Sequence, residues 1–255
     1  MGQGRSWIAG LLVTGVLAGT AWGQGGGPGG NQGKPEDKVK QALAAFVKQY
    51  SEGEKKKDEN LRVSAFELLN GMLSDQRALD TVAKVLGVKS ETDSVKTRAA
   101  QMLGESANPK AIPVLAKAFD ANERNTNVAS VIARELGKFN DKAALKELDR
   151  IIRSRVDRFD DLEGCSIACA GIVASGRLRF TETIDMLIGL LGPIWAKRPP
   201  KGRQLTGDDQ VAEDQRNSIE EALVNALKEI TGQELSAYDE WKAWWDANKK
   251  TWQPQ

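Results

Sequence analysis

The residues best suited to forming a binding surface are the tryptophans near the C-terminus. The final stretch, EWKAWWDANKKTWQPQ, holds four of the seven tryptophans in a chain of 255 residues. A terminal helix over about 237–251 would place these four on one face: Trp241, Trp244, Trp245 and Trp252. Such a stripe indicates a capping helix that packs on the apolar Ile219–Ile230 stripe, or a flat aromatic platform for a sugar or peptide. The capping interpretation is favoured because apolar helical stripes are usually core, but two adjacent tryptophans cannot both point straight inward.

A second group of candidate binding residues lies in GPIWAKRPPKGRQLTGDDQVAEDQRN. This stretch lacks helical periodicity until near its end and predicts a loop insertion over about 193–216. Its aromatic and basic residues could grip an acidic partner surface: Trp195, Lys197, Arg198, Lys201 and Arg203. The alternative is a solvated insertion whose basic first half and acidic second half neutralise each other.

Two cysteines, Cys165 and Cys169, lie four residues apart on the apolar face of a predicted helix. The favoured interpretation is a pair of small core residues, since unpaired cysteine behaves as a buried hydrophobe. A disulfide in an oxidising compartment remains an alternative, although regular helical side-chain directions suit it poorly. A metal site shared with Asp160 or Asp161 is a weaker alternative, since structural zinc normally has four sulfur or nitrogen ligands.

The chain contains no histidine, which excludes Ser-His-Asp, Cys-His and histidine-bearing zinc sites. A formal G-x-G-x-x-G occurs at Gly25, Gly27 and Gly30, but no strand-turn-helix context surrounds it, so it is a chance match. No catalytic residue, cofactor or metal is therefore predicted. The protein is not expected to be an enzyme.

Composition and charge narrow the fold and the partners. The sequence is 40% hydrophobic with only 6% aromatic residues, which favours helices over sheets. Arg5 is the only charged residue before Lys34, so a chain without its first segment carries 35 basic and 35 acidic residues. A protein without net charge has no field to attract nucleic acid or an anionic membrane, and neither is expected as a partner.

The first residues have the order of a secretory signal peptide. One early cation precedes a short apolar run and small residues near a cleavage point, which predicts a signal peptide over 1–23. The apolar run is shorter than the roughly 20 residues that a membrane anchor needs, so no stable membrane insertion of the mature chain is expected. A glycine-rich flexible linker is predicted over 24–35. The mature protein is expected to be exported, to the periplasm or the extracellular space.

The remaining residues, 36–255, contain an internal repeat of about 33 residues. Three helical segments, LRVSAFELLN, VKTRAAQMLG and VASVIARELG, end in leucine followed by Asn70, Gly104 or Gly137. Glycine and asparagine tolerate the left-handed backbone that closes many helices. A second helix follows each segment, and a fourth helix pair is expected over about 161–191, closed in the same way at Gly176.

Local signals predict where some elements begin. Asp141 is expected to cap one helix, Ser218 to form a capping box with Glu221, and Ser236 to cap the tryptophan helix. The charged run SEGEKKKDEN is expected to be a solvated loop.

The segment from Val95 to Gly104, followed by Ala111-Ile112-Pro113-Val114-Leu115, resembles a HEAT-like repeat, and the likeness extends over about 59–191. The ending I-T-G followed by the tryptophan motif is similar to that of exported bacterial HEAT-repeat proteins. The expected fold is all-α: a right-handed α-solenoid of about five HEAT-type helix pairs plus an N-terminal helix.

The resemblance implies a non-catalytic scaffold that binds another exported protein, through its concave face or the 193–216 loop. A glycan- or cell-wall-binding module that uses the C-terminal tryptophans is the alternative. Some HEAT-like proteins are lyases acting on bilin chromophores, but only the shared repeat supports that remote possibility.

Overall fold

A computed structural model of the chain describes residues 35–159, 161–200 and 204–254. Their regular secondary structure is helical, with no strand among them, so the all-α class is confirmed over these residues. No helix in this part of the chain is both long enough and apolar enough to cross a bilayer. The signal peptide expected at 1–23, and all of the expected linker except residue 35, lie outside the described residues.

The chain divides into two compact units, Met1–Ala78 and Leu79–Gln255. In the first unit, three aromatic side chains form the core: the ring centroids of Phe46 and Tyr50 lie 5.4 Å apart, as do those of Phe46 and Phe66. The helices that begin in this unit are α1 (Pro35–Lys56), α2 (Glu59–Ala65), the short 3₁₀ helix η2 (Phe66–Leu69) and α3 (Gln76–Leu86).

The charged run expected to be a loop is mostly helix, because α1 continues to Lys56. Lys56 Nζ lies 2.6 Å from Glu52 Oε1, an i,i+4 pair that favours helix without any apolar residue. The chain leaves the helix at Lys57, whose φ is +54°. Asp58 then begins α2 by accepting a hydrogen bond from the backbone N–H of Leu61 at 3.0 Å.

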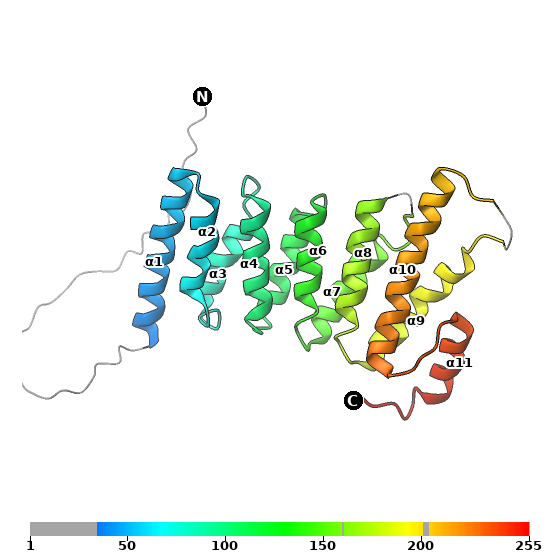
Figure 1. Cartoon of the computed structure of the whole chain (residues 1–255). Helices are drawn as coiled ribbons and strands as arrows, with labels where there is room; N and C mark the ends of the chain where they lie inside the picture. The colour runs from blue at the N-terminus through cyan, green and yellow to red at the C-terminus, as the bar shows by residue number, and fades with distance from the viewer. Residues whose placement is uncertain (1–34, 160, 201–203, 255) are drawn as a thin grey trace, which may run out of the picture. The chain divides into compact units, whose positions relative to one another are not determined.

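In the second unit, the even-numbered helices from α4 to α10 form a row in which each packs against the next even-numbered helix. Helix α4 packs against α6, α6 against α8 and α8 against α10, and Figure 1 shows these four side by side. Helices α5, α7 and α9 pack beside α6, α8 and α10 respectively. The bounds of these helices are α4 (Asp93–Glu105), α5 (Ala111–Ala121), α6 (Thr126–Leu136), α7 (Lys142–Arg153), α8 (Leu162–Ser175), α9 (Thr181–Ala196), α10 (Asp208–Thr231) and α11 (Tyr238–Asn248).

The three repeat glycines do not end their helices in the left-handed conformation, which corrects the expectation. Gly104 lies within α4, and Gly137 and Gly176 have right-handed φ angles of −70° and −56°. Asn70 likewise has a negative φ of −56°, and among the glycines that directly follow a described helix it is Gly232, after α10 with φ +70°, that closes the helix in the expected way.

The repeat glycines instead lie where the next helix of the row comes closest. A Cβ on Gly137 would be 2.5 Å from the carbonyl oxygen of Ala174, a distance that real Cβ atoms do not adopt. The residues that an added Cβ would meet are Glu135 of α6 for Gly104, Ala174 of α8 for Gly137, and Ala226 of α10 for Gly176. The repeated glycine therefore sets the spacing between neighbouring helices.

Helix starts agree with the sequence at one position and differ at two. Asp141 caps α7 by accepting from the backbone N–H of Ala143 at 2.7 Å. Ser218 lies in the interior of α10, where its hydroxyl donates to the carbonyl oxygen of Asp214, so it forms no capping box. At the start of α11 the carboxylate of Glu240 accepts from the backbone N–H groups of both Ser236 and Ala237, in place of a Ser236 cap.

The segment expected to be a loop over 193–216 is largely helical. Helix α9 continues through Pro193 to Ala196, and α10 begins at Asp208 with two acidic residues in its first turn. The segment between these helices is therefore 197–207. The extension of α10 is supported by polar i,i+3 and i,i+4 pairs and has no apolar periodicity that would predict a helix.

Candidate binding site

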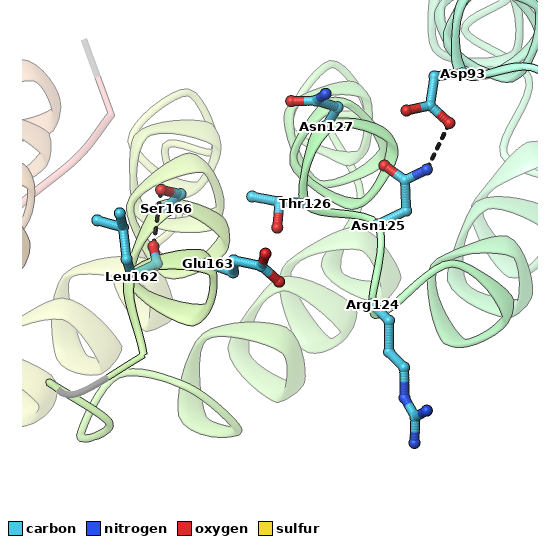
Figure 2. A pocket seen from close by; sticks show the side chains of 8 residues that line it. All are labelled: Asp93, Arg124, Asn125, Thr126, Asn127, Leu162, Glu163 and Ser166. Carbon is cyan, nitrogen blue, oxygen red and sulfur yellow. Dashed lines mark hydrogen bonds between the residues drawn. The ribbon is translucent and has the colours of Figure 1, made fainter.

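An open hollow in the described part of the second unit lies where α4, α6 and α8 begin. Its volume is about 490 Å³, enough for a small ligand or a short segment of a partner. Figure 2 shows the side chains that line it, contributed by these helix starts and the turn between α5 and α6. They are Asp93, Arg124, Asn125, Thr126, Asn127, Leu162, Glu163 and Ser166.

Hydrogen bonds fix one wall of this hollow. The Asn125 side-chain amide donates to Asp93 Oδ1 at 2.5 Å, while its Oδ1 accepts from the backbone N–H of Val128 and caps α6. Asn125 thus joins the starts of two helices that lie 32 residues apart in sequence. On the opposite wall Ser166 donates to the carbonyl oxygen of Leu162 at 2.9 Å.

Two further side chains define the hollow. The Thr126 hydroxyl oxygen is shielded from solvent and has no hydrogen-bond partner among the described residues, so it lies beneath the surface that a ligand could touch. In Figure 2 it faces the Glu163 carboxylate across the gap between α6 and α8. Leu162 is 67% exposed at the rim, where it offers an apolar contact. The site combines hydrogen-bonding groups with an apolar contact, as protein-binding surfaces do.

The lining residues do not form a recognisable catalytic set. A carboxylate in the first turn of a helix, such as Asp93 or Glu163, is favourable because it faces the positive end of the helix dipole. No activated nucleophile, and no base oriented by a third group, lies among the lining residues. The described chain also holds no group of three or more His, Cys, Asp or Glu placed to bind a metal.

A second hollow, of about 390 Å³, lies beside the first and shares Arg124 and Asn125 with it. Lys89, Lys96 and Arg124 supply positive charge, and Asp120 and Glu123 supply negative charge. Lys96 is only 6% exposed, unlike most lysines. The two hollows thus border the same turn between α5 and α6 with different chemistry.

The C-terminal tryptophans form one cluster with two buried members. Trp241 is fully buried and Trp245 is 4% exposed, whereas Trp244 and Trp252 are half-buried. The ring centroids of successive members lie 5.9–6.1 Å apart, with Trp244 stacked on Trp245. Much of the surface of each ring is therefore covered by the neighbouring rings.

Helix α11 packs mainly against α9, whereas the sequence pointed to the Ile219–Ile230 stripe of α10. Trp245 Nε1 donates to Asp185 Oδ1 of α9 at 2.7 Å, and Lys249 Nζ donates to the same oxygen at 2.7 Å. The Tyr238 ring lies against Gly192, where an added Cβ would come within 3.0 Å of it. These contacts give the cluster a structural role at the end of the second unit.

The candidate basic residues are partly engaged within the chain. The Arg198 guanidinium lies 3.3 Å from the Trp195 ring centroid and also hydrogen-bonds Glu220 through two nitrogens. Lys197 Nζ lies 5.0 Å from the Phe159 ring centroid. Lys201 and Arg203 lie outside the described residues.

A partly buried ion-pair cluster continues from Arg198 into α10. Arg216, 3% exposed, donates to Glu213 at 2.5 Å and to Glu220 at 2.7 Å. The hydrogen bond from Arg216 holds the pKa of Glu213 below its usual value. Burial acts to raise the pKa of Glu220, but hydrogen bonds from Arg198 and Arg216 outweigh it and lower the pKa.

Both cysteines are free thiols in the structure, Cys165 buried and Cys169 half-buried. The hydrogen bond between the two thiols, followed by burial, raises the pKa of Cys169, and the same hydrogen bond lowers the pKa of Cys165, whose Sγ also lies 3.6 Å from the carbonyl oxygen of Gln215. The raised pKa makes the Cys169 thiol a poor nucleophile and a poor metal ligand at neutral pH, and Cys165 is only 4% exposed. This arrangement fits the core interpretation of the pair.

No protein-family model matches the chain, and no curated protein is significantly similar to it in sequence.

Sequence reasoning did not single out the residues of the two hollows. Asp93, Asn125 and Asp161 lie at or next to successive starts in the row α4, α6 and α8. These residues are spaced by about one repeat, and equivalent positions of successive repeats lie side by side. The spacing therefore predicts that they lie along one edge. Aligning the capping residues as well as the apolar stripes would have identified this edge.

Proposed function

We propose that the protein is a non-catalytic scaffold that is exported from the cytoplasm and binds another exported protein. Its helices, on this proposal, form a right-handed α-solenoid of HEAT-type pairs, and the partner binds where α4, α6 and α8 begin. The observation that carries the proposal is the hollow of Figure 2, which spans three successive helix starts without a catalytic set of residues. The repeated glycine contacts support the solenoid, because they recur between each helix and the next in its row.

The glycan-binding alternative has less support. A sugar platform requires exposed indole faces, but Trp241 and Trp245 are buried and their neighbours are half-buried. Trp245 also uses its only hydrogen-bond donor on Asp185. The interaction scaffold is therefore the function that the geometry supports best.

Site-specific photo-cross-linking tests the proposal. A photoreactive residue placed at Asn127, on the rim of the hollow, is expected to capture one defined protein from the exported fraction of the native cell. The same residue placed at Glu229, exposed on α10, is the matched control and should not capture it. The chain used begins at Gln24, after the expected signal peptide.

A blocked variant makes the test specific. Thr126→Arg combined with Ser166→Arg fills the hollow from both walls and should abolish the cross-link while leaving the helical circular dichroism unchanged. Equal capture from Asn127 and Glu229, or capture that survives the blocking substitutions, would contradict binding at this edge. Recovery of cell-wall material alone would favour the tryptophan platform instead.

A further inference from the structure

The ammonium group of Lys96 is buried without a carboxylate partner. The side chain is 6% exposed, and its Nζ donates to Asn122 Oδ1 at 3.1 Å and, more weakly, to the carbonyl oxygen of Lys89 at 3.4 Å. Both acceptors are neutral. Burying a charge is costly unless a counter-charge or a full set of hydrogen bonds compensates it. An ammonium carries three donors, and the described contacts use two of them.

The other charges around the 390 Å³ hollow do not neutralise Lys96. Asp120, which lines the hollow, pairs with Arg150 at 2.9 Å, and Glu123 lies 3.9 Å from Arg155. Those arginines lie outside the lining set, so they draw the two carboxylates into pairs of their own. The positive charge of the lining cations is not neutralised in the same way, because neither Lys89 nor Arg124 forms an ion pair with any described residue.

The lysine is held in place by a polar shell. Asn122 is 7% exposed, and its side-chain amide nitrogen donates to the carbonyl oxygen of Ala118 at 2.8 Å. That bond fixes the orientation of the amide and directs Oδ1 to Lys96. A cation positioned in this way at the wall of a hollow is preorganised for an anion, since little side-chain freedom remains to be lost on binding.

From this arrangement we infer that the hollow between α4 and the turn joining α5 to α6 binds an oxyanion, the phosphate or carboxylate group of a small ligand. Lys96 supplies the buried charge and the remaining ammonium donor. Arg124 and Lys89 supply further charge at the rim, and a guanidinium can hold two oxygens of such a group at once. This site does not depend on the scaffold proposal and could be present whether or not a protein binds at the neighbouring hollow.

Titration of the chain from Gln24 with inorganic phosphate, and separately with acetate, tests the inference by calorimetry and by amide NMR shifts. Wild-type protein should bind at least one of the two anions, with shifts at Lys96, Asn122 and Arg124. Lys96→Met should weaken binding by about tenfold or more, the effect of losing a hydrogen bond to a charged group. Lys110→Met, at an exposed lysine outside the hollow, is the matched control and should leave affinity unchanged.

The two anions distinguish the possible ligands. Binding of phosphate alone assigns a phosphorylated ligand, and binding of acetate alone assigns a carboxylate. If Lys96→Met fails to fold, Arg124→Gln at the exposed rim replaces it and should weaken binding several-fold. Binding of neither anion, unchanged affinity in the folded Lys96→Met variant, or shifts that map away from the hollow would overturn the inference.

Discussion

At the scale of single residues, glycine has two different structural roles in this chain. Gly232 permits a positive φ, which is the role usually assigned to a glycine at the end of a helix. Gly137 has an ordinary helical φ and matters because it has no side chain. In the sequence, both glycines directly follow the last residue of an amphipathic helix, a leucine in one case and a threonine in the other. Only the three-dimensional contacts therefore distinguish the two roles.

Gly137→Ala should lower the free energy of unfolding by about 1–3 kcal/mol, the usual cost of forcing extra volume into a packed contact. The added methyl would lie 2.5 Å from Ala174 O and 2.7 Å from Ala174 Cβ, so helix α8 would have to move away from α6. Urea unfolding followed by circular dichroism measures the change.

Gly189→Ala provides the matched control. Gly189 also lies within a helix, α9, but an added Cβ would have no atom within 4 Å. Alanine has the better helix propensity, so this variant should be more stable by roughly 0.5–1 kcal/mol. The spacer role of Gly137 is wrong if the two substitutions change stability in the same direction.

At the scale of helices, the sequence predicted those that have an apolar stripe and missed those held by charge. Fully buried alanines at 78, 111 and 144 mark the 33-residue repeat that made α3, α5 and α7 recognisable. The end of α1 and the first turns of α10 have no such stripe. They are supported by pairs such as Glu52 with Lys56 and Glu213 with Arg216, which apolar periodicity cannot detect.

The candidate sites were harder to predict than the helices. The tryptophan spacing correctly placed four aromatic residues in one cluster, but it put all four on one helix, whereas α11 ends at Asn248 and Trp252 follows it. Spacing alone also could not identify α9 as the surface they cover. The sequence also could not predict that Lys96 lacks a carboxylate partner. This depends on Asp120 and Glu123 being drawn to Arg150 and Arg155, which are distant in sequence from α4.

Arg216→Met tests whether charge holds the extended start of α10. The substitution removes the donor shared by Glu213 and Glu220 and leaves two partly buried carboxylates with fewer hydrogen bonds. At pH 7 it should cost about 1–3 kcal/mol, the range for hydrogen bonds to charged groups. Thermal and urea unfolding give the size of the effect, and amide hydrogen exchange over 208–218 gives its location.

The effect should depend on pH in one direction. The pKa values of Glu213 and Glu220 are lower in the folded chain than the ordinary value near 4.5. Their stabilising contribution is therefore complete above about pH 4.5 and is lost as the pH falls through the folded-state values. Arg216 stays charged throughout, so the difference between wild type and Arg216→Met should shrink on acidification. Lys242→Met, which breaks only the exposed pair with Asp246, should change neither stability nor its pH dependence measurably.

At the scale of the whole molecule, the second unit is joined mostly by contacts between helices close in the row. Ion pairs between repeats, such as Lys142 with Glu182, add to those contacts. In such an array stability is approximately a sum of each repeat and its interfaces, so a change at one end should spread only to the nearest helices. Helix α11, whose main contact is α9, is where this can be tested.

A chain ending at Gly232 lacks α11 and uncovers the part of α9 that contains Asp185 and Gly192. Amide hydrogen exchange should then become faster in α9 and α10, while α4 to α7 keep their protection, because the main contact of the lost helix is with α9. Trp245→Phe is the milder comparison. It keeps an apolar ring but removes the hydrogen bond to Asp185 and part of the buried ring, so the loss of protection should be confined to α11 and its contact with α9. Equal acceleration from α4 through α10 after truncation would mean that the second unit unfolds as one cooperative block, which contradicts additive repeats.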